Sequence, residues 1–131
     1  MTLQNFQFET DADGIALVTW DMPGRSMNVI DAKVIDELSG IVEKVAADPA
    51  IKGAVIASGK DTFSGGADLA MLEDLASTFA ELVRSQGEEA ANAKVFEESR
   101  KLSLVYRRME TCGKPWVCAL NGTAMGGAFE L

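Results

Sequence analysis

Two glycine-rich segments carry the residues whose types and spacing could do chemistry. The second segment begins at Asn121-Gly122 and continues through Gly126 and Gly127 to a single carboxylate, Glu130. Glycine leaves the backbone bare, so the N–H groups of such a turn can approach a ligand closely. A carboxylate three residues after a free N–H can move a proton near an oxygen that this N–H stabilises. The spacing therefore predicts acid–base chemistry beside an anion-binding turn.

The first segment has the same form. Gly65, Gly66 and Ala67 follow an apolar run and lead into Asp68 and Leu69, where a helical pattern begins. A turn between a strand and a helix directs free N–H groups towards whatever lies above the strand end. Taken singly, either glycine pair is better explained as an ordinary turn. Two such turns beside a carboxylate favour an oxyanion hole, in which each turn donates one N–H to the same oxygen.

Short apolar runs place both turns at the ends of predicted strands. Residues 52–57 and 116–120 have the length and composition of strands, and the second is expected to be buried. An alternating pattern over residues 6–20, interrupted by a turn at Asp11-Ala12-Asp13-Gly14, predicts a hairpin. Strands joined by short links to helices indicate an α/β fold, in which ligands lie beyond the carboxyl ends of the strands.

Two helical regions connect these strands. One is predicted to begin after Asp31, a suitable N-cap, and to end at Asp48-Pro49. The other runs from Asp68, whose main role we expect to be N-capping, to Glu110, with a polar break at residues 87–92. Strand–helix–strand connections of this kind imply right-handed crossovers and parallel strand pairs.

Composition excludes several classes of protein. A net charge of −8 over 131 residues argues against a nucleic-acid partner, and the length allows one domain at most. No apolar run is long enough to span a membrane, and the first residues do not have the pattern of a secretion signal. We therefore expect a bacterial cytoplasmic or organelle-matrix location. Histidine is absent, and Cys112 and Cys118 are expected to be reduced, so no metal site is expected.

The two glycine segments resemble the paired oxyanion loops of the crotonase superfamily. This superfamily comprises enoyl-CoA hydratases, isomerases and the hydratase part of multifunctional fatty-acid oxidation proteins. The matching stretches are residues 53–69 and 114–131, and the resemblance covers essentially the whole chain. Asp21-Met22-Pro23-Gly24 with Met27-Asn28-Val29 is similar to the opening of the multifunctional subgroup. The resemblance implies an α/β fold of the crotonase-like (ClpP/crotonase) type, a ββα spiral.

The resemblance also implies roles for individual residues. Ala67 and Gly127 match the two oxyanion N–H donors, and Glu130 matches the first of two catalytic glutamates. We expect Glu130 to lie in a partly buried site and to orient or deprotonate the attacking water. Lys60 could reach a phosphate of coenzyme A, but we interpret it as an exposed surface lysine. The implied substrate- and coenzyme A-binding residues are Met27, Asn28, Gly65, Gly66, Ala67, Asp68, Leu69, Gly126 and Gly127.

Two departures from the family pattern shape the expected boundaries. The third glycine of the family motif is replaced by Ala128, and the second catalytic glutamate would lie beyond Leu131. Residues 1–131 are therefore expected to be the N-terminal part of a single crotonase-like domain, truncated before its C-terminal elements. We expect this part alone to be inactive, to expose apolar faces and to self-associate.

For the full-length protein, the resemblance implies hydration of 2-enoyl-CoA thioesters in fatty-acid β-oxidation. It implies no cofactor apart from the coenzyme A carried by the substrate. It also implies that the protein forms a homotrimer or hexamer. One alternative is the hydratase/isomerase part of a bifunctional protein that also carries a 3-hydroxyacyl-CoA dehydrogenase. Another alternative is a non-catalytic acyl-CoA-binding module.

Overall fold

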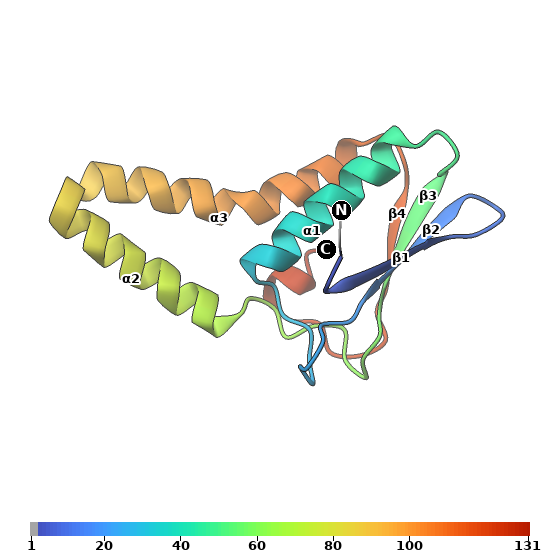
Figure 1. Ribbon diagram of the computed structural model, residues 1–131, viewed down its shortest axis with the longest axis horizontal. Coiled ribbons are helices and arrows are strands. Elements are labelled where there is room, and N and C mark those ends of the chain that lie inside the picture. Colours follow the sequence, from blue (N-terminus) through green and yellow to red (C-terminus); the bar gives the residue numbers. More distant parts are fainter. Residues whose placement is uncertain (1–2) are drawn as a thin grey trace.

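The computed structural model describes residues 3–131. A four-stranded sheet lies at one end of the molecule, on the right in Figure 1. The strands lie in the order β1 (Phe6–Thr10), β2 (Ile15–Trp20), β3 (Gly53–Ser58) and β4 (Trp116–Ala119). β1 and β2 form the predicted antiparallel hairpin, whereas β2, β3 and β4 run parallel to one another. Each parallel pair is therefore joined through helices, as the sequence predicts.

Helix α1 (Ala32–Ala47) supplies much of the core. Asp31 caps it as predicted, because its side chain accepts a hydrogen bond from Val34 N at 2.8 Å. The helix ends before Asp48, where Pro49 follows. Its apolar stripe is buried together with alternate residues of β2, and full burial of each such side chain contributes about 1.5–3 kcal/mol. These buried residues are Val34, Leu38, Ile41, Val42 and Val45 of α1, with Ala16, Val18 and Trp20 of β2.

Helices α2 (Leu69–Gln86) and α3 (Glu88–Thr111) form a long hairpin that projects away from the sheet (Figure 1). The predicted polar break is confined to Gly87, which has a φ of 90°. The rest of that stretch belongs to α3, where Glu88 and Glu89 suit the positive end of the helix dipole. No residue of α2 is buried by the described chain. Despite their length, none of the helices within residues 3–131 is apolar enough to cross a membrane.

Strand β4 was predicted to be buried, and this prediction is wrong. β4 is the edge of the sheet, and its side chains alternate between half-buried and exposed. Val117 is 59% exposed and lies in register with Val55 of β3 and Leu17 of β2. Because the alternate residues of β2 face the core, this apolar row lies on the opposite face of the sheet. The exposed apolar faces expected from the sequence are thus present.

Candidate active site

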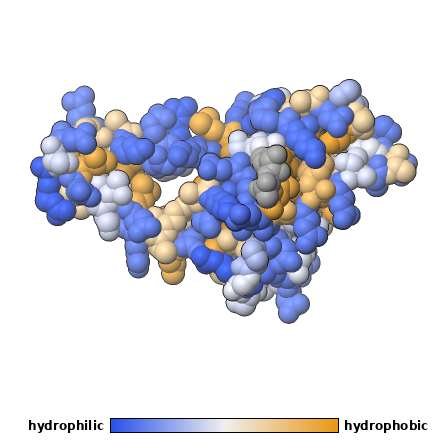
Figure 2. Space-filling view, viewed as in Figure 1, coloured by the Kyte–Doolittle hydropathy of each residue, from blue (hydrophilic) through white to orange (hydrophobic). Residues whose placement is uncertain are grey.

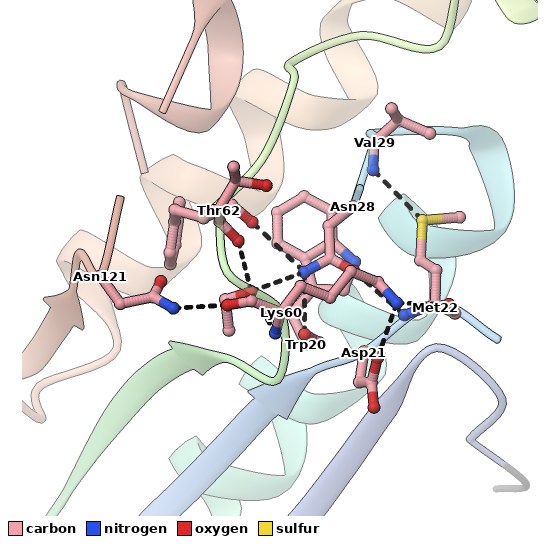
Figure 3. A network of polar contacts seen from close by, with 10 residues as sticks. Trp20, Asp21, Met22, Asn28, Val29, Lys60, Thr62 and Asn121 are labelled. Carbon is pink, nitrogen blue, oxygen red and sulfur yellow. Dashed lines mark hydrogen bonds and ion pairs between the residues drawn. The ribbon is translucent and has the colours of Figure 1, made fainter. Parts of the chain in front are cut away.

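Asn28 holds together the segments beneath the two glycine turns. Its side chain is 0% exposed, and its Oδ1 accepts a hydrogen bond from Met22 N at 3.0 Å. Its Nδ2 donates to the carbonyls of Trp20 at 2.8 Å and Phe63 at 3.2 Å, as Figure 3 illustrates around the central amide. The prediction that Asn28 lines the ligand is therefore corrected. With its side chain enclosed and bonded, Asn28 supports the site from inside.

Lys60 also lies inside the structure, which corrects its interpretation as an exposed surface lysine. Its side chain is only 12% exposed, and Nζ pairs with the Asp21 carboxylate at 2.8 Å. The same ammonium donates to the Met22 carbonyl at 2.8 Å (Figure 3). A largely buried charge requires such partners. Lys60 therefore fixes the turn after β2 to the loop after β3, and it has its bonds within the protein.

The first glycine turn leaves the Ala67 N–H free. Ile30 N donates to the Gly66 carbonyl at 2.7 Å, and Asp68 N donates to the Ile30 carbonyl at 2.8 Å. Ala67 lies between these bonded groups, opposite Ile30, and its own N–H has no acceptor within residues 3–131. Successive N–H groups of an extended segment point to opposite sides. Because the Asp68 N–H points towards Ile30, the Ala67 N–H points away from it.

The two glycine turns lie against each other. Ser64 N donates to the Thr123 carbonyl, and Met125 N donates to the Ser64 carbonyl, each at 3.1 Å. Beside these bonds, a β-carbon on Gly66 would lie 2.7 Å from the Met125 carbonyl oxygen, which is closer than atoms can approach. Gly66 also has a φ of 85°, so both the space and the conformation require glycine. The structure therefore brings together two turns that α2 and α3 separate in the sequence.

The second turn also offers free N–H groups. It forms a 3-10 turn, η1 (Gly126–Ala128), in place of the first α-helical turn that the sequence suggests. The next three amides donate back along the chain, but those of Gly126 and Gly127 have no acceptor in the described chain. Gly127 packs closely beneath α3, because a β-carbon there would lie 3.1 Å from the Leu102 side chain. The three bonded amides are those of Ala128, Phe129 and Glu130.

Two cavities of the described chain meet at Ala67. One, of about 500 Å³, gathers most of the predicted ligand-binding residues of the first turn and the loop after β2. The other, of about 430 Å³, lies between α1, α2 and α3 and has a mainly apolar lining. Apolar side chains gather along the facing sides of α2 and α3 in Figure 2. The first cavity is lined by Met27, Gly65, Ala67, Asp68 and Leu69 among others, and the second by Ile30, Ala67, Met71, Leu72, Leu75 and Leu102 among others.

Asp68 caps α2, as predicted from the sequence. Its carboxylate accepts hydrogen bonds from Ala70 N at 2.8 Å and Met71 N at 3.2 Å, and it pairs with Arg25 at 2.7 Å. Burial raises the pKa of Asp68, but the two amide bonds and the Arg25 charge together bring this pKa below its usual value. The carboxylate that follows Ala67 in the sequence is therefore held ionised and bonded, which suits it to a structural role.

Glu130, the predicted catalytic carboxylate, lies beyond η1. Its side chain is exposed, so the expectation of a partly buried site is not met in this structure. It lines a third cavity, of about 650 Å³, together with Tyr106, Trp116 and Leu131, and it lines neither cavity at Ala67. The physical reason is that η1 is a single short turn, after which Phe129 and Glu130 are exposed while Leu131 packs against the core.

Tyr106 is a residue of the site that the sequence analysis did not single out. Its hydroxyl donates a hydrogen bond to the Gly127 carbonyl at 2.7 Å. The pKa of Tyr106 is raised far above its usual value. The largest cause is burial, followed by the negative charge of Glu130 and then by the charge of the Cys118 thiolate. The phenol therefore remains a proton donor. The only signal in the sequence was a polar group at a core-facing helical position.

The described residues hold no group suited to bind a metal ion. Within residues 3–131, no three histidine, cysteine, aspartate or glutamate side chains lie together in such an arrangement. Cys112 and Cys118 are free thiols, and burial raises the pKa of Cys118. The chemistry that this arrangement offers is that of free backbone N–H groups on two touching turns, two adjoining cavities, and a carboxylate three residues after Gly127.

Sequence comparison identifies relatives over nearly the whole chain. A family model described as enoyl-CoA hydratase/isomerase matches residues 10–131. The chain is 36% identical over 129 residues to the fatty acid oxidation complex subunit alpha of Shewanella amazonensis. It is 35% identical to the same subunit of Shewanella halifaxensis. Each alignment covers 98% of this chain but only 16% of the relative, so the chain spans a small part of the length of these proteins.

Solved structures show the same fold. An enoyl-CoA hydratase from Shewanella pealeana superposes with a TM-score of 0.78 at 19% identity, covering 95% of this chain and 42% of that one. An enoyl-CoA hydratase/isomerase (crotonase) from Legionella pneumophila gives a TM-score of 0.77 at 22% identity, covering 97% and 44%. The crotonase-like fold expected from the sequence is thus confirmed. Since the family model also matches almost every residue, the chain belongs to the enoyl-CoA hydratase/isomerase family.

Proposed function

We propose that the full-length protein hydrates 2-enoyl-CoA thioesters in fatty-acid oxidation. The observation that carries this proposal is that the N–H groups of Ala67 and Gly127 have no acceptor in the described chain and lie on glycine turns that touch each other. Membership of the enoyl-CoA hydratase/isomerase family and similarity to subunits of fatty acid oxidation complexes support the same chemistry.

In this reaction, water adds across the double bond that is conjugated with the thioester carbonyl. Negative charge develops on the thioester oxygen as the water oxygen bonds to C3, and a proton then arrives at C2. Two N–H groups directed at that oxygen stabilise the enolate, and loss of one such donor typically slows catalysis by roughly 10²–10³-fold. Ala67 and Gly127 supply these donors without side-chain rearrangement, because both groups belong to the backbone.

The two cavities at Ala67 suit the two ends of an acyl-CoA. The apolar cavity between α1, α2 and α3 would take the acyl chain, with Leu72 and Leu102 in contact with it. Each buried methylene would contribute about 0.8 kcal/mol. The cavity beside Met27 and Leu69 would take the pantetheine side of the thioester. Ala67 lines both cavities, which supports a role for its N–H at the thioester carbonyl that would join the two ends of the substrate.

We assign to Glu130 the orientation or deprotonation of the attacking water. Its position three residues after Gly127 places it one turn from the second donor. In the described chain it is exposed, so this role requires the residues after η1 to turn the carboxylate towards the Ala67 cavities. A second acid of the full-length protein would supply the proton at C2.

The proposal extends to the assembly and location of the protein. The exposed apolar row formed by Leu17, Val55 and Val117 requires a cover, which is consistent with a larger domain and with a homo-oligomer. A cytoplasmic location is supported by the bacterial origin of the similar fatty acid oxidation subunits.

A bifunctional protein that also carries a 3-hydroxyacyl-CoA dehydrogenase is a second candidate. It is favoured by the similarity to subunits of fatty acid oxidation complexes, in which this chain matches only 16% of the length. The discriminating measurement is coupled reduction of NAD by the full-length protein when it is given a 2-enoyl-CoA.

The primary test follows loss of the enone absorbance when purified full-length protein is mixed with a short 2-enoyl-CoA. We expect hydration by the unchanged protein and a severe loss with Glu130→Gln, which retains the size of the side chain but not its basicity. Glu110→Gln, at an exposed glutamate of α3, is the matched control and should retain activity. A protein that binds acyl-CoA but hydrates none would instead be a binding module.

A further inference from the structure

We propose that Tyr106 is a positioning residue that holds the Gly127 N–H in line with the substrate carbonyl. This inference rests on the proposed function, because it concerns the second of the two oxyanion donors. Tyr106 itself would touch neither the substrate nor the reacting atoms. Its hydroxyl acts on the backbone of the turn that carries the donor, through the 2.7 Å hydrogen bond to the Gly127 carbonyl.

The turn that carries Gly127 has few hydrogen bonds to other parts of the described chain. η1 is three residues long, and its backbone bonds are those of a 3-10 turn, whose geometry is poorer than that of an α-helix. Gly127 has no side chain to restrict its torsion angles. Within residues 3–131, the hydroxyl of Tyr106 is the one side-chain group that hydrogen bonds to residues 126–131. Ala128 anchors the end of this turn in the core, and the bond from Tyr106 is the one side-chain hydrogen bond that acts on its Gly127 peptide.

The geometry of a helical turn explains how a bond to a carbonyl controls an amide. Carbonyl and N–H groups of such a turn point in opposite directions along its axis. Gly127 contributes the carbonyl that faces Tyr106 on α3 and the free N–H at the start of the turn. When Tyr106 holds the carbonyl, it fixes the direction of the turn and hence that of the N–H. Gly127 also packs close to the side chains of Leu102 and Ile30, but these apolar contacts do not hold a particular peptide group by a hydrogen bond.

The phenol ring alone would not have this effect. Tyr106 is half-buried and lies beside Glu130, and its hydroxyl remains protonated there, so it acts as a donor to the carbonyl. A phenylalanine would fill the same space and leave the Gly127 carbonyl with only the amide of Glu130, at 3.2 Å, as a donor within the described chain. Replacing the hydroxyl therefore separates positioning from packing.

The test compares Tyr106→Phe with the unchanged full-length protein in two measurements. The first is kcat and KM for hydration of a short 2-enoyl-CoA. The second is the infrared stretch of the isotopically labelled thioester carbonyl in the bound complex, which falls in frequency as its hydrogen bonds strengthen. We expect kcat to fall about tenfold, as misplacement of a catalytic group does, with KM changed less than about twofold. We also expect a smaller lowering of the carbonyl frequency.

Two further variants control the experiment. Thr111→Val removes another hydroxyl of α3, which donates to the Arg107 carbonyl at 2.8 Å within the same helix, and it should change neither measurement. Incorporation of 3-fluorotyrosine at position 106 retains both ring and donor, and it should preserve kcat and the carbonyl frequency. Thermal unfolding of each variant establishes that it is folded.

The possible outcomes distinguish this inference from the proposed function. If the unchanged protein neither hydrates the substrate nor lowers its carbonyl frequency, the proposed function fails. If it does both and Tyr106→Phe matches it in both measurements, the positioning role of Tyr106 is wrong while the function stands. A fall in kcat with an unchanged carbonyl frequency would also overturn the positioning role.

Discussion

The two glycine turns present the same kind of free N–H group but are supported very differently. The first turn is bonded on both sides, to Ile30 and to Thr123, and its Gly65 N–H donates to the Asn28 carbonyl at 2.9 Å. The second turn is joined to the first through Thr123 and Met125, but beyond Met125 the described chain gives it its own 3-10 bonds and a single side-chain bond, from Tyr106. One donor of the proposed pair therefore lies in a segment that is hydrogen-bonded on both sides, and the other in a short turn that accepts one side-chain hydrogen bond from α3.

This difference has a consequence for how the site is stabilised. Local stability follows the density of buried contacts and protected hydrogen bonds. The first turn lies above the most enclosed part of the molecule, where Asn28 and Phe63 are fully buried. The second turn is flanked by the exposed side chains of Met125 and Phe129. Substitutions at the first turn should therefore unfold the protein, whereas those at the second should mainly change the orientation of its donor.

The largest effect is expected for Asn28→Ala. The change removes one amide that bonds to Met22, Trp20 and Phe63 and leaves three buried backbone groups without it. The Trp20 carbonyl keeps its bond from Gly59 N, so two groups, Met22 N and the Phe63 carbonyl, are left unsatisfied. Since each unsatisfied group costs about 1–3 kcal/mol, we expect a loss of about 2–5 kcal/mol in the free energy of unfolding. Urea denaturation measures this loss. Asn121→Ala, which removes one exposed bond to the Lys60 carbonyl, should lose less than about 1 kcal/mol. Equal losses in the two variants would contradict the proposed role of Asn28.

Alanine at Gly66 and at Gly127 compares the two turns directly. At Gly66 the φ of 85° is unfavourable for alanine, and the new methyl would overlap a backbone oxygen of Met125, so we expect a loss of about 2–4 kcal/mol. At Gly127 the methyl would meet the flexible end of Leu102 at 3.1 Å, so the loss should be below about 1 kcal/mol. Thermal unfolding of both variants checks the order. A larger loss at Gly127 would reverse our assignment of the rigid and the adjustable turn.

Features of the fold that depend on neighbouring residues were predictable from the sequence. The alternation of β1 and β2 gave their hairpin, and Asp31 and Asp68 cap the helices that follow them. The order of strands, glycine turns and helices was enough to indicate the α/β fold and both turns of the site. In each case the cause lies within a few residues of its effect.

Features that depend on distant partners were not predictable in the same way. Lys60 looks like a surface residue until Asp21 and Met22 are placed beside it. β4 has the composition of a buried strand but lies at the edge of the sheet. Its own sequence does not determine which elements will pack beside it, so its exposure could not be predicted. Tyr106 could be assigned to a helix face, but its bond to Gly127 required the tertiary structure.

A smaller effect is expected for Lys60→Met, which removes a second polar group that supports the loop leading into the first turn. Methionine retains the length of the side chain but loses the bonds to Asp21 and the Met22 carbonyl. Because the Asp21 side chain is partly exposed and can be hydrated, we expect a loss of only about 1–2 kcal/mol in the free energy of unfolding. Urea denaturation measures it, and Lys52→Met, at an exposed lysine, is the control that should be neutral. A loss as large as that of Asn28→Ala would mean that the ammonium, too, is essential to the core.

The smallest effect concerns pH and tests whether the carboxylate beside Ala67 is structural. Asp68 has a folded-state pKa below its usual value, so its contribution to stability is present above the unfolded-state pKa of about 3.9 and is lost as the pH falls through the folded-state pKa. Asp68→Asn keeps a capping oxygen but loses the charge that pairs with Arg25, which is 48% exposed. Between pH 5 and pH 3, urea midpoints should therefore fall less steeply in the variant than in the unchanged protein. Asp13→Asn, at an exposed aspartate of the hairpin turn, should keep the original slope. Parallel slopes for Asp68→Asn and the unchanged protein would show that the charge of Asp68 adds nothing to its cap.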